Sequence, residues 1–293
     1  MPYATAADGT RLHYEEAGSG TPILFIHEFG GDCRAWEPQL NYFSRRHRCI
    51  TYSARGYAPS DIPADVDAYS QAIAVSDALA VLDHLGIARA HIVGLSMGGF
   101  ATLHFGLTAP ERALSLTIAG AGYGAEKQYE DYFRGVSLEV ADRFATLGAV
   151  EFSKTYALGA SRVQFQNKDP RGWQAFADRL AQHSDIGAAN TMRGVQAQRP
   201  SIYDLEDQIR ACTLPALIMV GDEDDHCLQP GIFMKRCLQA SGLAVLPKTG
   251  HTLNLEEPAL FNQLLAEFIA MVEAGRWTPR DPRAEAGQIM KTT

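Results

Sequence analysis

HIVGLSMGGFATL, residues 91–103, joins a short apolar run to a helical pattern through a serine that glycines flank. The run at 91–93 predicts a buried strand that ends at the glycine. The residues that follow the serine place apolar side chains on one face of a helix, namely Phe100, Leu103 and Leu107. The stretch therefore predicts a strand, a sharp turn and a helix, with the serine at the apex of the turn.

Ser96 is the candidate nucleophile that this turn presents. Side chains at Gly94 and Gly98 would crowd a strained turn, which favours glycine at both positions. The turn pushes the Ser96 hydroxyl out of the sheet, where a base can reach it. The pentapeptide G-x-S-x-G is common by chance, so its interpretation depends on partners elsewhere in the chain.

The rest of the chain alternates apolar runs with helical patterns. Strands are expected at 22–27, 48–53, 89–95, 113–119, 214–220 and 243–247, and helices at 69–85, 97–109 and 256–273. Because strands alternate with helices, the fold class is α/β, with a mostly parallel central sheet flanked by helices.

One long segment departs from this alternation. Residues 126–199 show helical patterns and scattered aromatic side chains but no apolar strand run. We therefore expect an α/β core of residues 1–120 and 207–275 that is interrupted by an all-helical cap at 121–206. The tail at 276–293 lacks apolar periodicity and is expected to be disordered or to lie on the surface.

Composition narrows the class of protein. A net charge of −8 argues against nucleic acid or an anionic membrane as the main partner. The five cysteines are odd in number and contain no C-x-x-C pair, which favours reduced thiols over a disulfide framework. The amino-terminal residues show no signal peptide, and no apolar stretch is long enough to span a membrane. The sequence thus predicts a cytoplasmic protein.

A serine nucleophile needs a base and an orienting acid, and the chain offers both in loops that follow strands. His251 comes directly after the strand expected at 243–247, so it falls at the ligand-binding edge of a parallel sheet. The loop GDEDDH, residues 221–226, follows another strand and offers three aspartates as the acid, Asp222, Asp224 and Asp225. The order serine, aspartate, histidine is the one described for α/β-hydrolases.

Two other features of these loops bear on chemistry. His226 and Cys227 stand beside the aspartates, but the spacing fits neither an EF-hand nor a zinc pattern, and we predict no metal site. An oxyanion hole needs two backbone N–H donors, and by position these are Met97, after the nucleophile, and Phe29, in the loop HEFGG at 27–31.

Together these segments resemble the α/β-hydrolase fold superfamily over about residues 10–272. HEFGG is similar to the family's oxyanion loop, GLSMGG to its nucleophile elbow, GDED to its acid loop and GHTLNLEEP to its histidine loop. The segment YSARGYAPSD at 52–61 is similar to a further family segment. The resemblance implies a catalytic triad of Ser96, Asp224 and His251, with Asp225 as the reserve acid. It also implies that the helical insertion is a lid over the substrate pocket, and that no cofactor is needed.

One position departs from the family pattern. The family's oxyanion loop usually reads His-Gly, whereas this chain has His27-Glu28. Two hypotheses follow: Glu28 turns away and is bonded structurally, or it borders the pocket and tunes the charge of the substrate or of His251. We assign His27 and Glu28 to the candidate pocket on this basis.

The resemblance leaves three functions open, all with a small-molecule partner. The first is a serine esterase or lactonase that cleaves a small, mainly apolar substrate through an acyl-enzyme. The second is a hydrolase of a carbon–carbon bond in a ring-fission dienoic acid, which needs a pocket arginine; the cap offers Arg134, Arg143, Arg162, Arg179 and Arg193. The third is a slow or non-catalytic ligand receptor on the same fold. The oligomeric state stays open, with a homodimer as one option.

Overall fold

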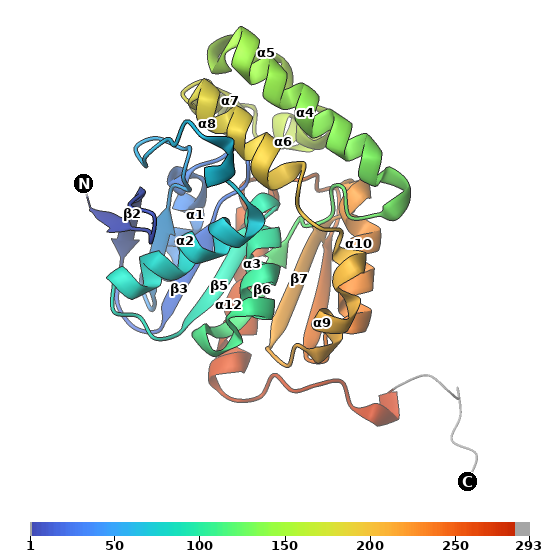
Figure 1. Ribbon diagram of the computed structural model, residues 1–293. Coiled ribbons are helices and arrows are strands. Elements are labelled where there is room, and N and C mark those ends of the chain that lie inside the picture. The colour runs from blue at the N-terminus through green and yellow to red at the C-terminus, as the bar shows by residue number, and fades with distance from the viewer. Residues whose placement is uncertain (1, 285–293) are drawn as a thin grey trace.

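The computed structural model describes residues 2–284, which form one sheet with helices on both faces (Figure 1). The strands are β1 Tyr3–Thr5, β2 Arg11–Ala17, β3 Pro22–Ile26, β4 Arg48–Tyr52, β5 Ala90–Leu95, β6 Ala113–Ala119, β7 Ala216–Gly221 and β8 Ser241–Leu246. The core helices are α1 Glu37–Phe43, α2 Gln71–His84, α3 Met97–Thr108, α9 Glu206–Ala211, α10 Asp225–Cys237, α11 Leu253–Glu256 and α12 Pro258–Glu273.

The sheet order is β1-β2-β4-β3-β5-β6-β7-β8, and the predicted α/β class is confirmed. β1 and β2 are antiparallel to their neighbours, whereas β4, β3 and β5 to β8 run parallel. The carboxyl ends of the parallel strands therefore meet at one edge, and the chain reverses its direction of winding between β3 and β5. Ligands bind at such a switch point in open α/β sheets.

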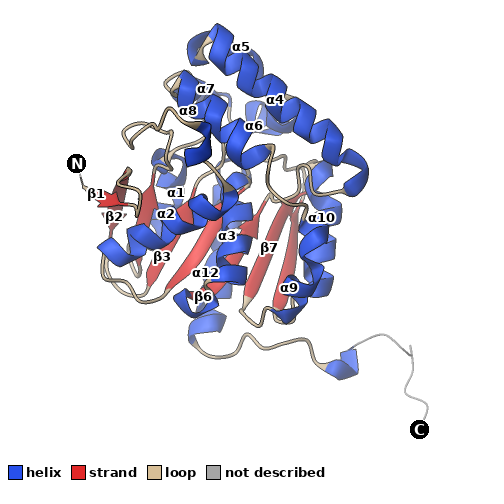
Figure 2. Ribbon diagram, in the orientation of Figure 1, coloured by secondary structure: helices blue, strands red, loops and turns tan. Residues whose placement is uncertain are grey.

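Helices cover both faces of the sheet (Figure 2), and alternate strand residues supply an apolar layer beneath each set of helices. On β3, Leu24 and Ile26 pack with α2 and α3, while Ile23 and Phe25 pack with α1 and α12. This alternation follows from the two-residue period of a strand. Because the parallel strands are covered on both faces, they read in the sequence as continuous apolar runs rather than as alternating ones.

The segment between β6 and β7 is helical, as its sequence pattern predicts. It contains α4 Glu130–Leu147, α5 Ala149–Tyr156, α6 Val163–Lys168, α7 Pro170–Leu180 and α8 Asp185–Asn190, and a π-helical turn Thr191–Gln196 continues α8. Figure 1 shows these helices stacked beyond one edge of the sheet. Their apolar side chains share a core with loop residues of the sheet, including Phe29, Tyr57 and Met97. The helices thus lie over the carboxyl ends of the strands.

Some element boundaries differ from the prediction. The helix expected at 256–273 is two helices, α11 and α12, because Pro258 starts a new helix at its first position and has no N–H to continue the preceding one. β1, α1, α9 and α10 are elements that the sequence did not indicate. Of the tail, residues 276–284 lie along the core, where the Trp277 ring packs on Phe268; residues 285–293 fall outside the described part.

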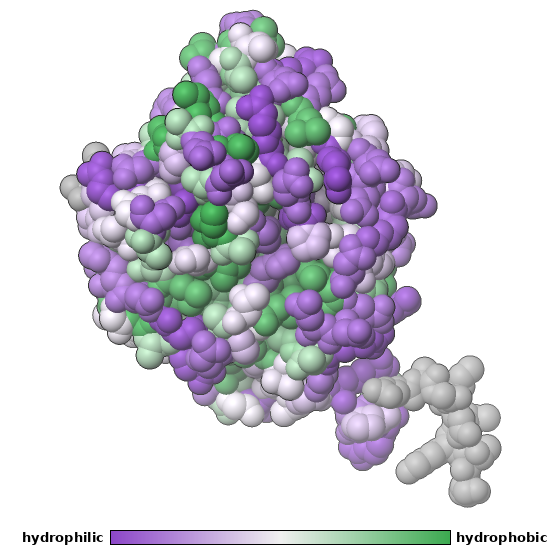
Figure 3. All heavy atoms as spheres, in the orientation of Figure 1, coloured by the Kyte–Doolittle hydropathy of each residue, from purple (hydrophilic) through white to green (hydrophobic). Residues whose placement is uncertain are grey.

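The state of the cysteines and the polarity of the surface are as the amino-acid composition predicts. All five cysteines are buried and unpaired, as expected for reduced thiols. Within residues 2–284, helices long and apolar enough to cross a bilayer are absent. Figure 3 shows hydrophilic side chains over much of the visible face, with apolar side chains in smaller patches between them.

Candidate active site

Ser96 lies at the apex of a strained turn between β5 and α3. Its φ of 57° and ψ of −113° are values that side-chain-bearing residues rarely adopt. A Cβ at Gly94 would stand 2.0 Å from the Gly98 carbonyl oxygen, and a Cβ at Gly98 would stand 2.0 Å from the Ile26 carbonyl oxygen. The two glycines are therefore required by the backbone packing around the serine.

His251 and Asp224 form a buried pair beside this turn. His251 Nδ1 lies 2.7 Å from Asp224 Oδ2, and the two side chains are 6% and 0% exposed. Burial raises the pKa of the Asp224 carboxyl, but the imidazole and hydrogen bonds outweigh it and hold the pKa below its ordinary value. The Tyr123 ring packs edge-on against His251 with 5.0 Å between ring centroids, which fixes the plane of the imidazole.

The structure separates the three candidate acids. Asp224 is buried at the end of the loop after β7, whereas Asp222 is exposed and accepts the Thr249 N–H at 3.1 Å. Asp225, the reserve acid, is an exposed residue that begins α10 and does not contact His251. Only Asp224 among them has the position that an orienting acid requires.

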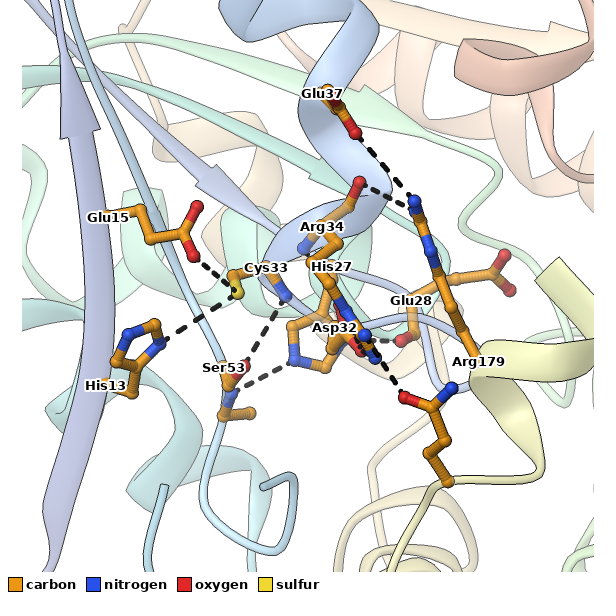
Figure 4. A network of polar contacts seen from close by, with 12 residues as sticks. His13, Glu15, His27, Glu28, Asp32, Cys33, Arg34, Glu37, Ser53 and Arg179 are labelled. Carbon is orange, nitrogen blue, oxygen red and sulfur yellow. Dashed lines mark hydrogen bonds and ion pairs between the residues drawn. The ribbon is translucent and has the colours of Figure 1, made fainter. Parts of the chain in front are cut away.

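The loop after β3 carries Phe29 and His27, and Figure 4 shows how it is held. The His27 ring accepts the Ala54 N–H at Nε2 over 3.0 Å and lies 2.6 Å from the Glu28 carbonyl oxygen at Nδ1. Burial lowers the pKa of His27, so its neutral ring holds the loop in shape. Within the described residues the Phe29 amide has no hydrogen-bond acceptor, and Met97 begins α3 directly after Ser96.

Glu28 borders the pocket and is also bonded structurally, which joins the two hypotheses for it. Its carboxylate is 2% exposed and forms a two-point ion pair with Arg162 of the cap, one arm of which spans 2.9 Å between Arg162 Nη1 and Glu28 Oε1. Burial raises the pKa of Glu28, but the guanidinium outweighs it and keeps the pKa below its ordinary value. Arg162 also donates to Thr252 Oγ1, next to His251.

A cavity of about 410 Å³ lies between the cap and the strand ends. Ser96, His251, Phe29 and Glu28 all line it, so the structure brings these four predicted residues together. Cap side chains form the opposite wall, among them Phe133, Val140, Phe152, Tyr156 and Met192. Met97 and His27 do not line this cavity; Met97 is available to it only through its backbone N–H.

The five cap arginines considered for the carbon–carbon alternative each have a carboxylate partner. The pairs are Arg134 with Glu130, Arg143 with Glu139, Arg162 with Glu28, Arg179 with Glu37 and Arg193 with Asp142. Arg162 is buried and faces the cavity, while the others are about a third exposed or more. Figure 4 shows Arg179 reaching from α7 to the Arg34 carbonyl oxygen, which ties the cap to the loop after β3.

Potential metal-ligating atoms gather in two places within residues 2–284. Asp224, Cys227 and His251 form one group, and His13, Glu15 and Cys33 form the other, which Figure 4 shows. Burial raises the pKa of the Cys227 thiol well above its ordinary value and that of Cys33 to about 11. Since transition metals bind the thiolate, neither thiol is prepared as a ligand at neutral pH. The absence of a metal stays a prediction.

Comparison with known proteins identifies the family of this chain. A family model described as the alpha/beta hydrolase fold matches residues 21–258. This chain belongs to that family. It is 39% identical over 281 residues to a putative carbamate hydrolase of Azorhizobium caulinodans, covering 93% of this chain and 100% of the relative. It is 27% identical over 255 residues to 3-oxoadipate enol-lactonase 1 of Acinetobacter baylyi, covering 86% of this chain and 89% of the relative.

Solved structures agree on the fold. The crystal structure of the enol-lactonase from Burkholderia xenovorans superposes with a TM-score of 0.82 at 22% identity, covering 92% of this chain and 100% of that one. The relatives are enzymes, and together they support hydrolase activity on this fold.

Three residues of the site were not singled out from the sequence. Tyr123 packs on His251, Thr252 accepts from Arg162, and Arg199 lines the cavity at the end of the cap. Thr252 stands directly after the predicted histidine, so its place in the site follows from that neighbour. The segment QAQRPS that carries Arg199 has no pattern that indicates a site.

Proposed function

We propose that this protein is a serine hydrolase that cleaves a small carboxylic ester or lactone through an acyl-enzyme. One observation carries the proposal: Ser96 occupies a strained turn that lines the same cavity as His251, and His251 is held by the buried Asp224 at 2.7 Å. Nucleophile, base and orienting acid are the three parts that serine hydrolysis needs.

The position of the proton on the His251 imidazole follows from this geometry. Asp224 is ionised at neutral pH because its pKa is held below the ordinary value, and a carboxylate can only accept a hydrogen bond. His251 Nδ1 must therefore carry the proton, and Nε2 is left with a lone pair. In this tautomer Nε2 is the general base for the Ser96 hydroxyl.

The proposed reaction has two halves. Ser96 Oγ attacks the acyl carbon while His251 Nε2 takes its proton, and the N–H groups of Phe29 and Met97 stabilise the oxyanion. Collapse of the intermediate breaks the carbon–oxygen bond, and His251 returns the proton to the leaving alcohol. Water then attacks the acyl-enzyme with the same base, which releases the acid and restores Ser96.

The cavity and the relatives support this substrate class. The wall residues Phe133, Val140, Phe152 and Met192 favour a small, mainly apolar acyl or alcohol group. One relative is named an enol-lactonase and another a putative carbamate hydrolase, and both names describe attack on an acyl carbon next to oxygen or nitrogen. The carbon–carbon alternative needs an arginine free to bind a dienoate. The five arginines considered for it are all paired, so this alternative would depend on Arg199, which lines the cavity without an ion pair in residues 2–284.

The test is a substrate panel with wild-type protein and Ser96→Ala. It compares ethyl butyrate, δ-valerolactone and a ring-fission dienoic acid. We expect ester or lactone cleavage by the wild type and a fall in kcat of at least ~10³-fold in the variant, as loss of a triad nucleophile causes. Equal rates with the two proteins would overturn the proposal, and cleavage of the dienoate alone would favour the carbon–carbon alternative.

A further inference from the structure

The Ser96 cavity is lined by more arginines than glutamates. Three glutamates line it, and each pairs with an arginine: Glu28 with Arg162, Glu130 with Arg134, and Glu139 with Arg143. A fourth arginine, Arg199, also lines the cavity and forms no ion pair with any group in residues 2–284. The cavity wall therefore carries one uncompensated positive charge, although the chain as a whole has a net charge of −8.

Neutral groups hold the Arg199 guanidinium in place. It lies 3.7 Å from the centroid of the Phe100 ring, and its Nη2 donates to the Tyr123 carbonyl oxygen at 2.5 Å. Its Nη1 donates to Gln196 Oε1. Burial lowers the pKa of Arg199 to about 9, so the group is still cationic at neutral pH. Its side chain is partly buried, and a cation that is partly removed from water and lacks a counterion favours an anion beside it.

Arg199 retains hydrogen-bond donors for such an anion. A guanidinium has about five N–H donors in a planar fork. Two of them are used within the described part of the chain, one each by Gln196 and Tyr123, which leaves Nε–H and one N–H on each Nη. This is the donor pattern that matches a carboxylate at two points.

The guanidinium is also close to the reacting centre. Phe100, which it covers, lies one helical turn beyond Ser96, and the Phe100 N–H donates to the Ser96 carbonyl oxygen at 2.9 Å. Four residues of α-helix rise by about 6 Å. Tyr123, its other neighbour, packs on His251. Arg199 thus contacts neighbours of both Ser96 and His251, and all three residues line the same cavity.

We propose that Arg199 binds a carboxylate carried by the substrate, so that the substrate class is the half-ester of a short dicarboxylic acid or a lactone that bears a free carboxylate. The inference rests on the proposed function, because it assumes an ester attacked by Ser96. In monoethyl glutarate the free carboxylate stands roughly 5 Å from the scissile carbonyl, given bonds of about 1.5 Å. Arg199 and Ser96 line the same cavity, and we expect a half-ester of this length to reach both.

The experiment compares monoethyl glutarate with its neutral counterpart ethyl valerate by ethanol release. The wild type should favour the glutarate. In Arg199→Gln, kcat/KM for the glutarate should fall ~10-fold to ~150-fold, mostly through KM, because the carboxylate loses a charge-assisted hydrogen-bond partner. Ethyl valerate should change less than about threefold, since it makes no ion pair. Arg193→Gln is the matched control, because Arg193 belongs to the same cap but pairs with Asp142 and does not line the cavity.

Two measurements separate this site from a structural role for Arg199. Arg199→Lys keeps the charge and should keep a preference for the glutarate. Free glutarate should inhibit wild-type hydrolysis of ethyl valerate competitively, whereas the neutral glutaramide should not. If Arg199→Gln slows both esters equally, or if glutarate does not inhibit, Arg199 only joins cap to core and the inference is wrong while the proposed function stands. If the wild type cleaves neither ester and does not open δ-valerolactone, the proposed function fails as well.

Discussion

Glu28→Gln tests the most unusual residue of the oxyanion loop. The change removes one charge and keeps the side-chain shape, and it leaves the Arg162 guanidinium, 3% exposed, without its partner. Breaking a buried ion pair on one side costs about 3–5 kcal/mol. At about 2–3 °C per kcal/mol for a chain of this size, the melting temperature should fall by roughly 6–15 °C.

The same substitution should affect catalysis through the histidine loop. Arg162 donates to Thr252 Oγ1. The backbone N–H of His251 donates to the carbonyl oxygen of Ser161, the residue before Arg162, over 3.2 Å. Displacement of the cap segment therefore moves the proposed base. A misplacement of about 1 Å costs up to ~10²-fold in rate, so we expect kcat to fall by ~10-fold or more.

The stability difference should depend on pH. The pKa of Glu28 is below its ordinary value in the folded state, since the pull of Arg162 exceeds the effect of burial. A depressed folded-state pKa stabilises the protein above the unfolded value of 4.5, and this contribution is lost as pH falls through the folded value. The gap between wild type and Glu28→Gln should therefore be full at pH 7 and shrink below pH 4.5.

The assay is thermal and urea unfolding of wild type, Glu28→Gln, Arg162→Met and the double variant. The cycle should give a coupling energy of about 2–3 kcal/mol. Asp142→Asn is the control, because its pair with Arg193 is 70% and 35% exposed and should be worth less than about 1 kcal/mol. An unchanged melting temperature for Glu28→Gln, with additive single effects, would refute the reasoning.

The remaining predictions concern the acid and the elbow. Asp224→Asn should lower kcat by ~10⁴-fold in an esterase assay, because the amide no longer enforces the His251 tautomer. Asp225 is exposed on α10, so Asp225→Asn should change kcat less than about twofold in the same assay. Similar losses in the two variants would contradict the assignment of Asp224. Gly98→Ala should either prevent soluble expression or cut esterase activity by ~10²-fold, because its Cβ would stand 2.0 Å from the Ile26 carbonyl oxygen. A fully active and equally stable variant would show that the backbone of the turn does not require glycine there.

Much of the fold was predictable because local chemistry determines it. Parallel strands buried on both faces give continuous apolar runs, and the loops that follow them carry the glycines, aspartates and histidine that meet at one edge. The order of these loops along the chain was enough to expect Ser96, Asp224 and His251 in one site. Among the three aspartates of the 221–226 loop, the family resemblance pointed to Asp224 with Asp225 in reserve, and the structure distinguishes the two by burial.

What the sequence did not reveal lies in contacts between distant segments. Glu28 and Arg162 are 134 positions apart, and nothing in either segment indicates that they pair. Arg199 is a single arginine before a proline, and its significance comes from being the cavity cation without a carboxylate among the described residues. Whether an arginine in a cap is paired or free is a property of packing, which the spacing of residues does not encode.

The central claim is that Ser96 is an activated nucleophile, and covalent labelling measures this most directly. Folded protein is treated with a fluorophosphonate probe, and the modified peptide is identified by mass spectrometry. We expect stoichiometric labelling at Ser96 that is lost in Ser96→Ala, strongly slowed in Asp224→Asn and absent after unfolding. Folded wild-type protein that stays unlabelled, or that is labelled at another serine, would contradict the account.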